Sequence, residues 1–123
     1  MDDQDGSEKD CIRHGKDFQL LGVYHKAIKY YEKRLKIAME IGDPGGEGTA
    51  YGNLAIAYCS LRDYRKAIEY LEKSLKIAME IGDQGGEGRT YGSLGNAYQY
   101  LGDYGKAIEY HDCLLYTSDA ADE

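Results

Sequence analysis

The chain has 123 residues and a formal net charge of -7, with 42% hydrophobic and 30% charged residues. The acids of residues 1–10 and 113–123 account for that charge, so the stretch between them is neutral and lacks the basic face that nucleic acid or anionic membrane requires. No apolar run approaches the roughly 20 residues that span a bilayer, and the acidic start does not resemble a signal peptide.

Taken in chain order, residues 1–10 are expected to form an acidic disordered N-terminus. The segment that follows, 11–21, is a diverged half-copy of a pattern repeated later, with Phe18 and Leu21 at the matching aromatic and leucine positions. Two long copies come next: residues 24–63 align with 64–103 without a gap, and 27 of the 40 positions are identical. A third copy begins at Tyr104, so the period is 40 residues.

Each copy contains two helical patterns. In the second pattern, apolar residues recur every three or four positions and predict one buried helix face, formed by Tyr64, Ala67, Ile68, Leu71, Leu75, Ala78 and Ile81. Gly82 is expected to end this helix, and Gly85 and Gly86 to keep a linker open until Glu87. Pro44 lies in the equivalent linker of the preceding copy. The predicted units are therefore 11–41, 47–81 and 87–112.

The first pattern of each copy is rich in glycine, notably Gly52, Gly92 and Gly95. Glycine inside a helix costs about 1 kcal/mol relative to alanine, so these positions predict close approach of a neighbouring helix. The turn between the two helices is about two residues long, as at Gly102-Asp103, which favours antiparallel packing. Stacked antiparallel helix pairs build a solenoid.

The segments YGNLAIAYCSLRDYRKAIEYLEKSLKIA and YGSLGNAYQYLGDYGKAIEY resemble the tetratricopeptide repeat signature, and the resemblance covers residues 11–112. It implies an all-α, right-handed superhelical solenoid of antiparallel helix hairpins, about two and a half repeats long. Within the family, the forty-residue spacing and the Ile-Gly-Asp linker are similar to the G-protein signalling modulator subgroup, which includes Pins-type adaptors. The chain departs from that subgroup in having fewer repeats and no GoLoco motif, so no spindle-orientation role is inferred.

A polar stripe lies opposite the buried face of the first helix in the last copy, formed by Arg89, Ser93, Asn96 and Tyr100. The equivalent stripe one copy earlier consists of Thr49, Asn53, Ile56 and Ser60. The resemblance implies that this face lines a concave groove that holds a peptide or helix of a partner. The simpler alternative is the ordinary polar side of a half-exposed helix. The predicted groove residues are Asn53, Ile56, Arg89, Ser93, Asn96 and Tyr100.

The predicted function is protein–protein interaction in an adaptor or scaffold, with a protein or peptide as partner and not nucleic acid, membrane or a small molecule. The alternative is a regulatory or sensing segment of a larger signalling or enzymatic protein. No catalytic motif is present, and three cysteines and three histidines without ligand spacing indicate neither a metal site nor a cofactor. The chain is expected to be cytoplasmic.

The repeat pattern stops in the middle of the third copy, after His111. Residues 113–122 resemble a translation of TGT CTC TTA TAC ACA TCT GAC GCT GCC GAC, a transposase adapter used in sequencing libraries. We therefore expect 113–123 to be a foreign tail. A natural, acidic disordered tail is the alternative.

Overall fold

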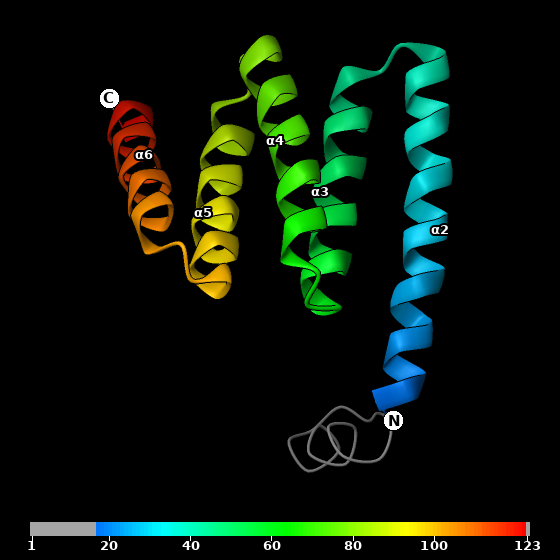
Figure 1. The fold of residues 1–123 in the computed structure, drawn as a ribbon. Helices are drawn as coiled ribbons and strands as arrows, with labels where there is room; N and C mark the ends of the chain where they lie inside the picture. Colours follow the sequence, from blue (N-terminus) through cyan, green and yellow to red (C-terminus); the bar gives the residue numbers. More distant parts are fainter. Residues whose placement is uncertain (1–16, 123) are drawn as a thin grey trace.

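The computed structural model describes residues 17–122, and the side chains of residues 22–115. Within this part of the chain all regular structure is α-helical. The helices are α2 (Asp17–Ile41), α3 (Pro44–Ser60), α4 (Tyr64–Ile81), α5 (Gln84–Leu101) and α6 (Tyr104–Asp122). They lie side by side in chain order, each antiparallel to the next, with α2 at one end of the row and α6 at the other (Figure 1). The predicted all-α solenoid of helix hairpins is confirmed.

Each of the four connections between helices ends in an aspartate, and these residues recur every twenty positions: Asp43, Asp63, Asp83 and Asp103. Every one of these carboxylates accepts a hydrogen bond from the backbone N–H three residues on, at 2.9–3.2 Å. Such a cap satisfies one of the backbone donors that a helix start leaves free. The residue before each aspartate has a positive φ, and at three of the four positions that residue is glycine.

The starts of α3 and α5 differ from the prediction by three residues. The sequence predicted helices from 47 and 87, whereas they begin at Pro44 and Gln84. Asp43 and Asp83 are the N-cap residues, so each helix begins at the next residue. The paired glycines that follow therefore belong to the first helical turn and not to an open linker. Proline fits at the first helical position because no helical hydrogen bond needs its missing N–H.

The N-terminal unit also differs from the predicted range 11–41. The turn that separates the two helices of later copies would fall at Gly22 and Val23, but α2 runs through both residues without a break. Valine lacks the carboxylate that caps the next helix at Asp63 and Asp103, so no side chain favours a new helix start there. Residues 17–21 therefore extend α2, while residues 1–10 and 11–16 lie outside the described part.

Helix α6 extends past the predicted end of the last unit at residue 112 and reaches Asp122. The backbone of 113–122 is thus helical although the repeat pattern has been lost. Extending an existing helix gains one hydrogen bond for each residue fixed and avoids the cost of starting a new helix. A helix can therefore continue beyond the sequence pattern that started it. A helical backbone is compatible with a natural or a foreign origin of the segment.

The core follows the row of helices as two adjoining clusters. Leu54 lies in the cluster between α2 and α3, and Leu94 in the cluster that joins α3, α4 and α5; neither side chain has solvent exposure. Tyrosine rings cover the edge of these clusters. Tyr58 stacks on Tyr70 at 5.7 Å between ring centroids, and Tyr98 repeats this contact forty residues later. Tyr58 and Tyr98 are themselves half-buried and pack against the cluster that joins α3, α4 and α5.

Candidate partner-binding groove

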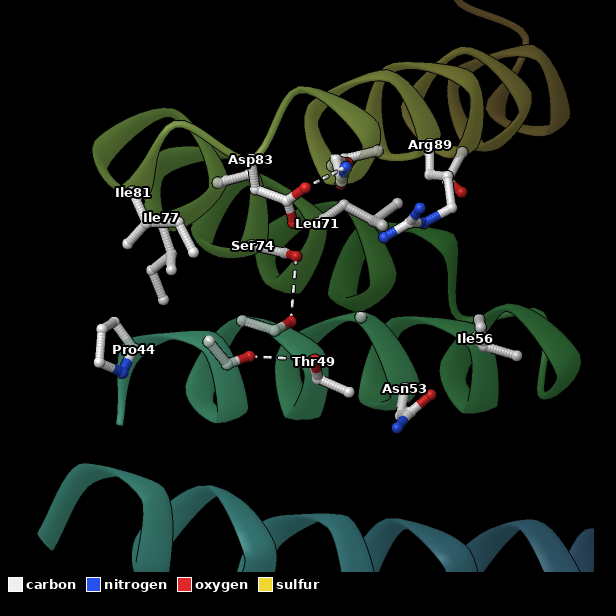
Figure 2. A pocket seen from close by; sticks show the side chains of 17 residues that line it. Pro44, Thr49, Asn53, Ile56, Leu71, Ser74, Ile77, Ile81, Asp83 and Arg89 are labelled. Carbon is white, nitrogen blue, oxygen red and sulfur yellow. Dashed lines mark hydrogen bonds between the residues drawn. The ribbon is translucent and has the colours of Figure 1, made fainter. Parts of the chain in front are cut away.

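An open hollow of about 260 Å³ lies between α3 and α5, with α4 as its floor. Figure 2 shows the two walls facing each other across α4, with Asn53 and Ile56 on α3 and Arg89 on α5. These walls come from equivalent helices of successive copies. Because the helices that form each hairpin pack against each other, the first helices of neighbouring copies stand apart and leave a space between them.

Glycine on α3 allows the floor to approach this wall closely. Ser74 Oγ on α4 donates a hydrogen bond of 3.1 Å to the backbone carbonyl oxygen of Gly48. A Cβ atom at Gly48 would stand 3.3 Å from Ile77 Cγ2, tighter than an ordinary van der Waals contact. At Gly52 the nearest atom would be 3.9 Å away, so close approach is required at Gly48 but not at Gly52.

Close approach is clearest further along, at Gly95 on α5. A Cβ atom there would lie 2.7 Å from His111 Nε2 on α6. In the preceding copy the equivalent pair is Ala55 and Leu71, both buried in one cluster. The glycine therefore accompanies the broader imidazole ring, and the predicted reason for Gly95 is confirmed.

Four of the six predicted groove residues line the hollow: Asn53, Ile56, Arg89 and Ser93. The other two lie on α5 outside it. Asn96 is exposed, and Tyr100, with 71% of its surface exposed, stacks on Tyr64 of α4 with ring centroids 5.0 Å apart. The six residues thus form a central set within the hollow and two flanking positions.

The floor residues Ser74, Ile77 and Ile81 were missed as groove residues, although all three line the hollow. The sequence placed Ile81 on the buried stripe, but the structure leaves it exposed and buries Ile77 instead. One available signal was the spacing of Ser74, Ile77 and Ile81, which are three and four residues apart and therefore share one side of α4.

Chemically, the hollow combines an aliphatic floor with a rim of hydrogen-bonding groups and one cation. The carboxylate of Asp83 is occupied in capping α5, and Thr49 Oγ1 donates to the Gly45 carbonyl oxygen at 3.0 Å. Asn53, Ser93 and Arg89 remain as the side chains suited to hydrogen-bond an incoming chain. Across the described residues, no three His, Cys, Asp or Glu side chains gather to hold a metal ion.

The hydropathy of the helices adds one finding about membranes. None of the helices in the described part is long and apolar enough to cross a bilayer.

A row of antiparallel helix hairpins with an open groove between equivalent helices defines a helical-repeat protein. A family model described as tetratricopeptide repeat matches residues 11–80 and again 46–115, and the chain belongs to this family. The chain is also similar to the crystal structure of the TPR domain of Arabidopsis FLU, with a TM-score of 0.75 and 27% identity. That match covers 89% of this chain and 92% of the other. No curated protein matches the chain.

Membership of this family carries a general expectation about activity. Tetratricopeptide repeats mediate protein–protein interaction, and their fold is typically non-catalytic. Function within such a fold depends on the side chains that line its surfaces, so the groove is where a specific role must be argued.

Proposed function

We propose that this chain is a protein-interaction module that binds a peptide or helix of a partner protein in the hollow between α3 and α5. The proposal rests on one observation: the walls of a single hollow, above the aliphatic floor formed by α4, include Asn53, Ile56, Arg89 and Ser93. A hollow of this kind offers apolar contact to side chains and hydrogen bonds to a peptide backbone. Asn96 and Tyr100 extend the contact along α5.

The role proposed for such a module is that of an adaptor or scaffold. The forty-residue period and the Ile-Gly-Asp linker, which resemble Pins-type modulators, support this part of the proposal. We also propose that the chain acts in the cytoplasm. The free thiol of Cys59 supports this, because unpaired cysteines are usual in reducing compartments, and imaging of a tagged chain would test it.

The groove can be tested with peptides selected for their ability to bind the chain. Binders would be selected from a library of short random peptides, and the dissociation constant of each would be measured by fluorescence anisotropy. Arg89→Ala and Asn53→Ala should each weaken binding by about tenfold, equivalent to about 1.4 kcal/mol, because each removes hydrogen bonds from the rim. Tyr100→Ala should weaken binding by a similar factor if the ligand extends along α5.

The matched control is Arg65→Ala, which removes an exposed arginine from α4 at a position that does not line the hollow. Binding of the selected peptides should be unchanged in this variant. Equal affinities for wild type, Arg89→Ala and Asn53→Ala would show that the peptides bind elsewhere and would contradict the proposed groove.

A further inference from the structure

One face of α2 is left uncovered where the equivalent face of α4 is covered. Ile37 is 53% exposed, whereas Ile77, forty residues later, is 8% exposed and packs against Gly48 on α3. Tyr30 is likewise exposed, whereas Tyr70 is half-buried in stacking contacts with rings of α3. The helix that covers α4 on this side has no counterpart on α2 among the described residues.

The uncovered face borders a second hollow, of about 500 Å³, between α2 and α3. Tyr30, Arg34 and Ile37 line it from α2, and Thr49 and Asn53 from α3. In the forty-residue register, α2 corresponds to the floor helix α4, and α3 corresponds to the wall helix α5. This hollow is therefore the equivalent of the α3–α5 hollow one copy earlier, with one wall absent. A helix placed on α2 as α3 lies on α4 would supply that wall.

The forty-residue register suggests one candidate for this place, the segment forty residues before α3. Its residues are a poor fit to the uncovered face of α2. The register would put Glu8 where α3 has Gly48, and His14 where α3 has the fully buried Leu54. Burying a charged or polar group without a partner costs several times what burying leucine contributes. Residues 17–21, which would complete that helix, belong instead to the unbroken α2.

The charge of α2 indicates what kind of helix would fit. The chain as a whole is acidic, yet α2 contains five Lys or Arg against three Asp or Glu. Lys26 and Lys33 correspond to Lys66 and Lys73, whose ammonium groups lie over tyrosine rings of α3 at 5.9 and 5.7 Å. Arg34 adds a third cation where α4 has the neutral Ser74.

We propose that the face of α2 formed by Tyr30, Arg34 and Ile37 docks an acidic amphipathic helix supplied by a partner protein. The helix lies antiparallel to α2 beside α3, with a small residue against Ile37 and an aromatic ring against Tyr30, as in the α3–α4 pair. Its aromatic rings lie under Lys26 and Lys33, as rings of α3 lie under Lys66 and Lys73, and its carboxylates lie near Arg34. Tyr30, Arg34 and Ile37 do not line the α3–α5 hollow and Arg89 does not line this one, although Thr49 and Asn53 line both.

A suitable probe is a synthetic peptide with the sequence of residues 43–61, which has the small and aromatic residues in register and carries two acids and no basic residue. Binding to the full chain would be followed by fluorescence anisotropy. We expect saturable binding that weakens by about tenfold or more in Ile37→Asp, and that weakens with added salt or when Glu47 of the peptide is replaced by lysine.

Met39→Asp is the matched control on the same helix, because Met39 and its equivalent Met79 are both 55% exposed. This variant should bind like wild type, as should Arg89→Ala. The peptide could instead bind α6 at the other end of the row, where Ile108 is 61% exposed. An equal loss in Ile37→Asp and Met39→Asp, or a loss only in Ile108→Asp, would overturn the proposal. Absence of any binding would also overturn it.

Two further measurements distinguish other occupants of the face. Sedimentation that shows a wild-type dimer and an Ile37→Asp monomer would mean that a second copy covers α2. Strongly improved peptide binding after removal of residues 1–16 would mean that the chain's own N-terminal segment occupies the face. Either result would overturn the partner helix; a monomer with unchanged affinity after truncation supports it.

Discussion

At the scale of single residues, the two complete copies show how one helix contact can be made in two ways. Where Gly95 lies against His111 in one copy, the equivalent residues of the preceding copy are Ala55 and Leu71, which belong to one buried cluster. The branched leucine leaves room for a methyl group, and the flat imidazole does not. The sequence marks Gly95 as unusual within a helix, but only packing identifies the ring that requires it.

Gly95→Ala should therefore destabilise the chain. Helix propensity alone would favour alanine by about 1 kcal/mol, but the clash with His111 should outweigh it and leave a net loss of about 1–3 kcal/mol. The free energy of unfolding in urea measures the effect. Combining Gly95→Ala with His111→Leu recreates the Ala55–Leu71 pair and should recover most of the loss. A double variant no more stable than Gly95→Ala would contradict this explanation.

At the scale of helices, the most consistent local signal is the aspartate that precedes each start. It determines where α3 and α5 begin, three residues before the starts predicted when the paired glycines were interpreted as an open linker. At the position equivalent to Asp63 and Asp103 the chain has Val23 instead of aspartate, and there α2 continues without a break. Periodicity identified the helices from residue 24 onward, whereas their ends depended on single capping side chains that the apolar pattern does not report.

Asp83→Ala should destabilise the chain by about 1 kcal/mol, because the hydrogen bond from the Gly86 N–H is lost at the start of α5. Asp83→Ser should retain most of the stability, since a serine hydroxyl also accepts at this position. Thermal unfolding followed by circular dichroism compares the two variants. Equal losses in both would indicate that the carboxylate acts by some means other than capping.

At the scale of the whole molecule, equivalent residues have different surroundings because the row of helices has two ends. Ile68 on α4 is 7% exposed and belongs to the cluster that joins α3, α4 and α5, while Ile108 on α6 is 61% exposed. The two side chains share sequence position, helix face and neighbours along the chain. What differs is the helix on the far side, which for α4 is α5.

Ile68→Ala should accordingly cost about 2–5 kcal/mol, the usual range for emptying a buried site. Ile108→Ala should change the free energy of unfolding by no more than about 0.5 kcal/mol, as expected at an exposed position. Urea denaturation of the full chain measures the free energy of unfolding of both variants. Similar losses in the two variants would mean that Ile108 is covered in solution.

The proposed adapter origin of residues 113–123 also concerns the molecule as a whole. It stays a prediction that the source nucleotides test directly, since any other codon choice through 113–122 would reject it. The helical backbone of this stretch is compatible with either origin, because helix propagation does not depend on a repeat.

The forty-residue period determined by itself the helix class, the hairpin unit and the solenoid, and it placed a polar stripe opposite the buried face of the first helices. These features follow from local spacing, which every copy repeats. Only the tertiary structure decided that Asn53, Ile56, Arg89 and Ser93 share one hollow, that α4 forms its floor, and that α2 has an uncovered face. The reason is physical: a periodic pattern describes how a helix contacts its neighbours, while the presence and distance of a neighbour depend on where the helix stands in the row.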